Sequence, residues 1–180
     1  VQPWVMRDAD GAVQGVMIIR GISFYDSEYF LVGDGAPVKL PFPLKASLQG
    51  LIKGQLVFTI EQDWPERGFK TGDVLAYDLA ALKRDPANAA PTLILRPGPR
   101  ESVEGVALTR NHLVVALYEN VRGGAYVYDF NGRAWTRQAT ESFQMDQTNA
   151  VIAQHVIIDA VRDPLFKMGI ASATVKDEAF

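Results

Sequence analysis

Residues Ser102–Asn120 are SVEGVALTRNHLVVALYEN, and an earlier part of the chain repeats this order of residue classes. The corresponding segments are Ser47–Leu51 and Ser102–Val106, the apolar runs Leu56–Ile60 and Leu113–Leu117, and the later segments Gly72–Leu79 and Gly124–Phe130. The offsets are 55 residues (102 − 47), 57 residues (113 − 56) and 51 residues (128 − 77). A period of this size, made of short apolar runs separated by turns, is typical of a repeated β unit and predicts a β-propeller.

Each repeat contains four predicted strands. They lie near residues 46–53, 55–62, 73–79 and 91–96 in one repeat, and near 103–109, 112–119, 124–130 and 134–138 in the other. Four strands followed by a new start is the strand count of a propeller blade. The second strand of each repeat is apolar at successive residues instead of alternating, which indicates burial on both faces, as between stacked blades. The predicted fold class is therefore all-β, a partial β-propeller of about three to four four-stranded antiparallel blades.

We expect residues 1–180 to form a single propeller segment. Its blade-like units would span roughly residues 15–43, 46–97 and 102–138, with a less regular unit at 150–180. Within the first unit, Val16–Phe24 and Glu28–Val32 are predicted strands. The segment Ala80–Pro91 is locally helix-prone but lies between two strands, so we interpret it as a long outer loop. The acidic segment Arg7–Gly11 fits an Asp-Gly hairpin turn better than a calcium loop, because the further oxygen ligands and the closing Glu of a calcium loop do not follow it.

Composition excludes several classes of function. The net charge is −3 and there is no cysteine, so neither phosphate neutralisation on a nucleic acid nor thiolate or Cys-based zinc chemistry is expected. No apolar run is long enough to span a bilayer, so we expect no membrane partner. The lack of cysteine favours the cytoplasm, with the periplasm as the alternative. The chain begins at Val1 without a leader, which favours a fragment of a larger protein.

Several short motifs occur in an order that resembles a known family. They are Tyr29–Val32 with Val38–Pro41, then Leu56–Phe58 with Asp63-Trp64 and Gly72–Leu79, then Pro97–Ser102 with Leu108–Arg110 and Leu113–Val115, and finally Glu119–Gly123 with Trp135. From about Gly15 to Trp135, the chain resembles the N-terminal propeller domain of the prolyl oligopeptidase family of serine peptidases. The terminal Asp177–Phe180 also resembles a family strand, whereas the span from Arg137 to Phe166 is longer than the family pattern.

The resemblance implies a function for a parent polypeptide and not for this chain alone. In that family a seven-bladed propeller caps a C-terminal α/β-hydrolase domain, which carries a Ser-Asp-His triad and cleaves short peptides after proline. The propeller filters substrates by size and carries no triad residue. We therefore expect a non-catalytic, substrate-gating segment whose partners are the hydrolase domain and short peptides. The parent protein would be the serine-type endopeptidase.

The residues themselves offer no catalytic or metal site. The nucleophile motif Gly-x-Ser-x-Gly is absent, and Ser23 lacks the second glycine and falls within a predicted strand. His112 aligns with Gln55 or Leu56 of the other repeat, and His155 is distant from it in the sequence. Each histidine is expected to be an ordinary surface or packed residue, and the pair gives no metal site. We accordingly predict no catalytic residue, no cofactor-binding residue, no metal ligand and no cofactor.

Two tryptophans and three arginines are candidate ligand-binding residues. Trp64 and Trp135 could stack on a ligand, but anchoring a blade edge by burial is the favoured interpretation. Arg100, Arg110 and Arg122 could bind a peptide carboxylate, but pairing with loop carbonyls and neighbouring acidic residues is favoured.

An alternative function remains open from the sequence. The chain could be a stand-alone β-propeller module that binds a protein or ligand and has no hydrolase activity. An open arc of blades exposes sheet faces and strand edges that a closed ring would cover. We therefore expect the isolated segment to self-associate.

Overall fold

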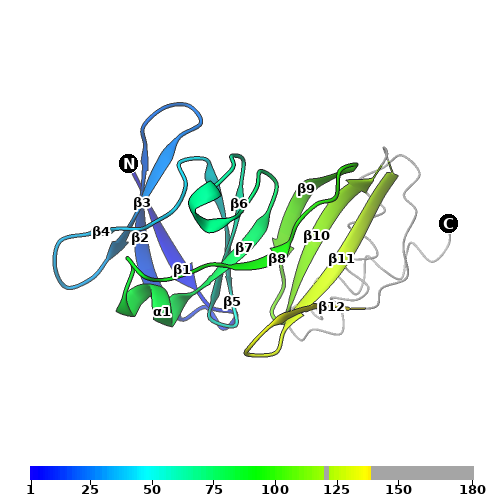
Figure 1. Cartoon of the computed structure of the whole chain (residues 1–180). Helices are drawn as coiled ribbons and strands as arrows, with labels where there is room; N and C mark the ends of the chain where they lie inside the picture. Colours follow the sequence, from blue (N-terminus) through cyan, green and yellow to red (C-terminus); the bar gives the residue numbers. More distant parts are fainter. Residues whose placement is uncertain (120–121, 139–180) are drawn as a thin grey trace. The chain divides into compact units, whose positions relative to one another are not determined.

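A computed structural model describes residues 1–119 and 122–138, which form three four-stranded antiparallel sheets (Figure 1). The first sheet contains β1 (Gln2–Arg7), β2 (Val13–Gly21), β3 (Ser27–Val32) and β4 (Val38–Lys39). The second contains β5 (Ala46–Ile52), β6 (Gln55–Ile60), β7 (Val74–Asp78) and β8 (Thr92–Leu95). The third contains β9 (Glu101–Leu108), β10 (His112–Glu119), β11 (Arg122–Phe130) and β12 (Trp135–Arg137). The predicted fold class, an all-β partial propeller with four-stranded antiparallel blades, is confirmed.

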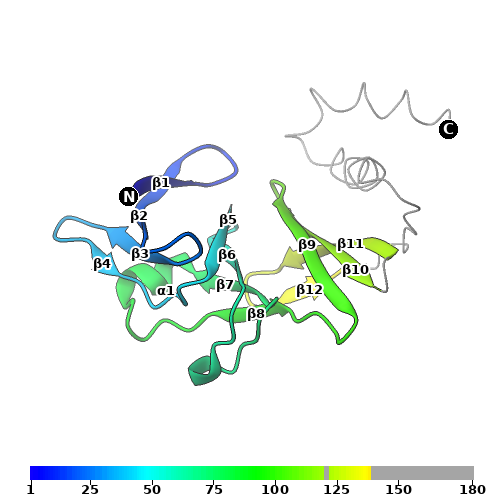
Figure 2. The same ribbon diagram turned by 90° about the horizontal axis from the view of Figure 1, so that it is seen from above.

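The strands of each sheet follow one another in chain order, as Figures 1 and 2 show. In the part of the chain that is described, no sheet closes on itself. The chain divides into two compact units, one of residues Val1–Arg96 and one that starts at Pro97. The first unit holds two of the sheets and the second holds the sheet β9–β12. The predicted unit at 150–180 and the long span between Arg137 and Phe166 lie outside the described residues, apart from Arg137 and Gln138.

The core of the first unit lies between its two sheets. Met6, Met17 and Leu31 of the first sheet belong to the same buried cluster as Phe58 and Tyr77 of the second sheet. Phe42, on the connection between the sheets, lies between these residues. Its ring centroid is 5.0 Å from that of Tyr29, 4.7 Å from that of Phe58 and 5.1 Å from that of Tyr77. The two sheets of this unit therefore bury apolar faces against each other, which is how neighbouring blades stack.

The second strand of each repeat is buried at successive residues, as predicted. In β6, the four residues Gln55–Phe58 are all buried, and in β10 the three residues Leu113–Val115 are buried. Because successive side chains of a strand point to opposite faces, this pattern requires cover on both faces of the sheet. The continuous apolar runs in the sequence thus reflect two-sided burial.

The strand pairing aligns the two repeats. Gln55 pairs with Asp78 across β6 and β7, and His112 pairs with Asp129 across β10 and β11. His112 therefore corresponds to Gln55, one of the two positions that the sequence left open. The first strand of each repeat also has a bulge immediately before a glycine, at Gln49 in β5 and at Glu104 in β9. A shared bulge indicates that the repeats have the same twist at that point.

The interpretation of Ala80–Pro91 as an outer loop was wrong over its first half, where the helix α1 (Leu79–Arg84) forms. The Asp78 side chain caps this helix by accepting a hydrogen bond from the amide of Ala81 at 2.7 Å. Leu79 and Leu82 of α1 are buried in the core of the first unit. The capping residue, the good helix formers and the two buried leucines therefore stabilise a helix here, although the segment lies between two strands.

Tyr77 makes the free energy of unfolding of the first unit depend on pH. Burial raises its pKa to about 12, and its hydroxyl donates to the carbonyl of Pro41 at 3.2 Å. The folded chain holds this proton more tightly than the unfolded chain, so the stabilisation is fully present below about pH 10. As the pH rises from about 10 to about 12, Tyr77 is expected to lower the free energy of unfolding by about 1.4 kcal/mol per pH unit.

The measurement is urea unfolding of the chain and of Tyr77→Phe at several pH values. The substitution is expected to make the decline above about pH 10 shallower without abolishing it, because burial also raises the pKa of Tyr29 and of Tyr128. An unchanged slope in Tyr77→Phe would contradict this assignment.

Candidate functional site

A network of polar contacts lies in the loop between β6 and β7, residues 61–73. It contains the short 3-10 helix η1 (Pro65–Arg67), which ends at Gly68 in the left-handed conformation with φ of 73°. The Glu61 amide donates to the carbonyl of Lys45 at 2.8 Å, and the Lys45 amide donates to the Gln62 side chain at 3.1 Å. The loop is thus fastened to the connection that enters the second sheet.

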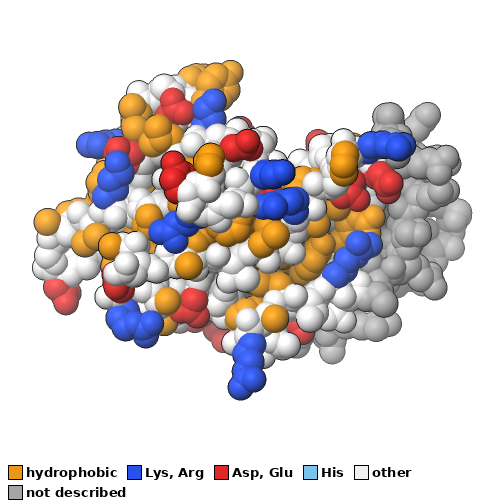
Figure 3. All heavy atoms as spheres, in the orientation of Figure 1, with side chains coloured by type: hydrophobic (Ala, Val, Ile, Leu, Met, Phe, Trp, Pro, Cys, Tyr) orange, Lys and Arg blue, Asp and Glu red, His pale blue; other side chains and the backbone are white. Residues whose placement is uncertain are grey.

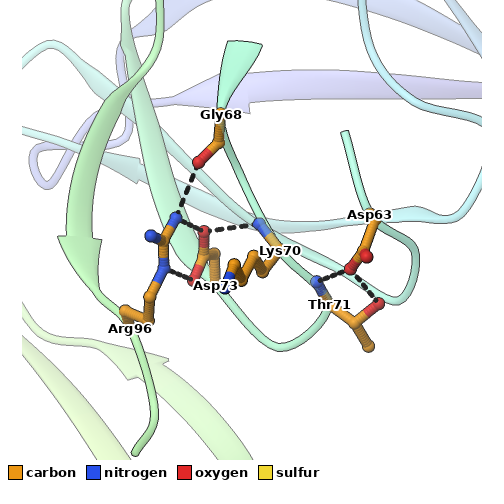
Figure 4. A network of polar contacts seen from close by, with 6 residues as sticks. All are labelled: Asp63, Gly68, Lys70, Thr71, Asp73 and Arg96. Atoms are coloured by element: carbon orange, nitrogen blue, oxygen red, sulfur yellow. Dashed lines mark hydrogen bonds and ion pairs between the residues drawn. The ribbon is translucent and has the colours of Figure 1, made fainter. Parts of the chain in front are cut away.

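A fully buried carboxylate, Asp73, organises this loop (Figure 4). It accepts hydrogen bonds from Arg96 Nε at 2.9 Å and from Arg96 Nη2 at 2.6 Å, which is a bidentate ion pair. It also accepts from the backbone amide of Lys70 at 2.8 Å, and Arg96 Nη2 donates to the carbonyl of Gly68 at 2.9 Å. These hydrogen bonds compensate the buried negative charge of Asp73. They also join the end of the loop at Asp73 to its middle part at Gly68 and Lys70.

A second carboxylate closes the outer part of the same loop. Asp63 Oδ1 accepts from the amide of Thr71 at 2.9 Å and from its hydroxyl at 3.1 Å. These bonds hold the pKa of Asp63 below its usual value, with the backbone amide as the largest cause. Figure 4 shows the two carboxylates on neighbouring parts of one loop, each directed at its own donors.

The loop also carries two aromatic side chains and one cationic side chain that contact one another. Trp64 is partly buried and packs against the core, and its ring lies 5.9 Å from that of Phe69. The guanidinium of Arg67 lies over the indole of Trp64 at 5.3 Å from the ring centroid. Arg67 Nη1 also donates to the carbonyl of Ala89 at 2.7 Å, which ties the loop to the segment after α1.

The polar side chains of this loop are held by hydrogen bonds within the chain. Both carboxylates accept hydrogen bonds from donors of the same unit, and residues 1–96 contain neither histidine nor cysteine. Among residues 1–119 and 122–138, no group of three or more acidic or histidine side chains is placed to hold a metal ion. The structure therefore supports a loop that presents Trp64 and Arg67 at fixed positions.

The three residues weighed as catalytic groups, Ser23, His112 and His155, belong to different parts of the chain. Ser23 was expected within a strand, but β2 ends at Gly21, and Ser23 lies in the turn, where its hydroxyl donates to Asp26 Oδ2 at 2.7 Å. His112 begins β10, and its amide donates to the hydroxyl of Thr109 at 3.0 Å. His155 lies outside the described residues.

The tryptophans take positions that agree with anchoring by burial. Trp64 packs on the core of the first unit, as described above. Trp135 is half-buried at the start of β12, and its ring lies 5.2 Å from that of Phe130, the residue with which it pairs.

The three arginines do not form one cluster. Arg100 precedes β9 and is exposed, whereas Arg110 is in the turn that follows β9, at the opposite end of that strand. Arg122 begins β11 and pairs with Glu119, which in turn pairs with Glu101. Backbone positions therefore place Arg100 and Arg122 at one end of the third sheet and Arg110 at the other.

Sequence reasoning missed the pair Asp73 and Arg96. The signal was available, because Asp73 stands immediately before the apolar strand β7 and Arg96 immediately after β8. Val74 pairs with Leu95, so the residues just outside the paired strands must be neighbours. The comparison of the two repeats could not reveal this pair, because the 51-residue offset aligns Asp73 with Gly124, which has no carboxylate.

In the part of the chain that is described, there is no helix with both the length and the apolar character required to cross a membrane.

Comparisons with known proteins identify one similar sequence and one similar solved structure. No protein-family model matches it. It is 33% identical over 139 residues to an uncharacterized peptidase, y4nA, of Sinorhizobium fredii (strain NBRC 101917 / NGR234), in a match that covers 73% of this chain and 19% of that protein. A solved structure of a post-proline cleaving enzyme from Rickettsia typhi matches with a TM-score of 0.63 and 16% identity, over 80% of this chain and 21% of that chain. The chain thus spans about a fifth of the length of either protein.

Proposed function

Because the chain is a β-propeller segment of the prolyl oligopeptidase family, we propose that it is the non-catalytic, substrate-gating part of a serine peptidase that hydrolyses short proline-containing peptides. One observation carries this proposal. The described residues form blade-like sheets, and the 180 residues lack a Gly-x-Ser-x-Gly nucleophile motif, yet the relative of the chain is a peptidase of which it covers only 19%. The catalytic groups would therefore belong to a hydrolase domain elsewhere in a longer polypeptide.

The loop between β6 and β7 supports a gating role. Loops positioned by a rigid scaffold of strands often carry the residues that contact substrates. The hydrogen bonds of Asp73 and Asp63 hold this loop in one conformation, and Trp64 and Arg67 give it a bulky, cationic surface. A peptide with a free carboxylate is a ligand that such a surface could contact.

The outer face of the first sheet supports the expected self-association of the isolated segment. Val5 pairs with Val16 and Val16 pairs with Val32, so the three valines form a row on the face opposite the core. Val5 is 42% exposed and Val32 is 37% exposed. A second copy of the segment or a further blade would cover this row.

The test compares the 180-residue chain with the longer polypeptide encoded by the same gene. The chain alone is expected to leave a proline-containing fluorogenic peptide uncut and to resist labelling by an active-site serine reagent. The longer polypeptide is expected to cut the peptide and to be labelled. If the longer polypeptide is inert in both assays, an interaction module without hydrolase activity becomes the better account. If the chain itself is labelled and cuts the peptide, its non-catalytic role is refuted.

A further inference from the structure

Exposed apolar side chains gather on the turn that joins β2 and β3, residues 22–26, which we call the β2–β3 tip. Ile22 is 55% exposed, Phe24 is 92% exposed and Tyr25 is 70% exposed. Figure 1 shows this turn projecting beyond the first sheet, and Figure 3 shows hydrophobic side chains gathered at the same end, at the top of the view. Large apolar side chains exposed together on a folded surface mark an interaction site more often than a free surface.

Hydrogen bonds hold the β2–β3 tip in one conformation. The amide of Ile22 donates to the carbonyl of Asp26 at 2.8 Å, and the hydroxyl of Ser23 donates to Asp26 Oδ2 at 2.7 Å. The amides of Tyr25 and Asp26 in turn donate to Ser23 Oγ at 3.2 and 3.1 Å. Because the turn is ordered before any partner binds, it loses little conformational entropy on binding.

The two aromatic rings form a single apolar surface. The Phe24 and Tyr25 rings meet edge to face with their centroids 4.9 Å apart. Rigid aromatic side chains are the residues that carry most of the binding energy in protein interfaces. Such an arrangement fits insertion into an apolar pocket.

An ion-paired cluster lies next to the base of the tip. Glu28, next to the first residue of β3, accepts from Lys39 Nζ at 2.7 Å and also pairs with Arg20. The two cations are 59% and 55% exposed. An apolar centre with a charged rim is the usual anatomy of a protein–protein interface.

A neighbouring blade would not cover this tip. The two sheets of the first unit meet through their faces, where Met17 and Leu31 share a cluster with Phe58. The tip begins after Gly21 and ends before Ser27, the last paired residues of β2 and β3, so it lies beyond the end of the sheet face. The chain covers only 19% of the peptidase and 21% of the solved structure that it matches, so most of either protein lies outside the matched part.

We propose that the β2–β3 tip docks this propeller segment onto the hydrolase domain of the same polypeptide, with Phe24 and Tyr25 inserted into an apolar pocket of that domain. This inference rests on the proposed function, which supplies the hydrolase domain. The tip fixes the position of the first unit relative to the domain whose access the propeller controls.

The experiment measures how fast a maleimide reacts with a thiol at the tip of the full-length protein. The 180 residues contain no cysteine, so Phe24→Cys introduces the only thiol of this chain, and its tryptic peptide identifies it by mass spectrometry. Val13→Cys is the matched control, because Val13 is 54% exposed and begins β2 at the opposite end from the tip. Each variant is labelled in the native state and in urea.

The Phe24→Cys thiol is expected to react at least about tenfold more slowly in the native full-length protein than in urea, while the Val13→Cys thiol reacts at similar rates in both. Equal native reactivity of the two thiols, or equal protection of both, overturns the inference. Protection that disappears on dilution also overturns it, because the occupant would then be a second copy. A full-length protein without peptidase activity refutes the proposed function, whereas an active peptidase with a freely reactive Phe24→Cys thiol refutes the docking inference alone.

Discussion

Replacing Asp73 by alanine is expected to lower the free energy of unfolding of the chain by about 3 kcal/mol. The carboxylate is fully buried, and its removal takes away the acceptor for Arg96 and for the amide of Lys70. The Arg96 side chain is 38% exposed and can be partly hydrated in the variant, which keeps the loss near the lower end of the range for broken buried pairs. Urea unfolding followed by tryptophan fluorescence measures the change, with Trp64 in the same loop.

Two further variants make this test specific. Glu66→Ala removes an exposed carboxylate from the same loop, and no ion pair or hydrogen bond of Glu66 is found in the described structure, so stability should change by less than about 0.5 kcal/mol. In a double-mutant cycle, Arg96→Ala should cost less in the Asp73→Ala background than alone, because the two side chains act as a unit. Additive losses, or an Asp73→Ala variant as stable as the parent, would show that the pair does not hold the loop.

Replacing Phe58 by alanine is expected to cost more, about 4 kcal/mol. The side chain is fully buried, and its ring lies 4.7 Å from that of Phe42 and stacks on that of Tyr77 at 5.4 Å. Alanine would leave a cavity at the centre of the first unit, where both sheets meet. The shift of the urea midpoint, converted with an unchanged slope, gives the free-energy loss.

The matched control is Phe24→Ala, because Phe24 is 92% exposed and should change stability by less than about 0.5 kcal/mol. If Phe58→Ala does not fold, Phe58→Leu provides a milder test, since it retains most of the volume and should cost less than about 1.5 kcal/mol. Equal effects of the Phe24 and Phe58 alanine substitutions would contradict the placement of the core between the two sheets.

The strands were predictable because they are short, locally encoded and repeated. The runs at Leu56–Ile60 and Leu113–Leu117 indicated both the period and the two-sided burial. The pairing of β6 with β7 and of β10 with β11 agrees with the period, and the burial of successive residues in β6 and β10 agrees with cover on both faces. Helix α1 was not predicted, because the segment lies between two strands and a position of that kind favours a loop. The Asp78 cap and the buried Leu82 show that tertiary contacts stabilise this short helix, which a sequence period does not reveal.

The candidate site was less predictable, because it depends on residues distant in sequence. Asp73 and Arg96 are 23 residues apart, and only the pairing of β7 with β8 brings them together. The apolar character of Phe24 and Tyr25 is visible in the sequence, but their exposure is not. From the sequence alone, both residues are equally compatible with core positions. The structure shows that β2 ends at Gly21, so both residues lie in the turn that follows it.

The strand order described above also bears on how the chain folds during synthesis. Within residues 1–119 and 122–138, every sheet pairs only strands that are consecutive in the chain. Each sheet can therefore form as soon as its own residues leave the ribosome, without waiting for a distant strand to complete it. The contacts that must form later are those between sheets, such as the hydrogen bond from Lys83 of α1 to the carbonyl of Gln14 in β2, which joins residues 69 positions apart. We expect hairpins to be early folding intermediates and the docking of the second sheet on the first to be the slow, stabilising step.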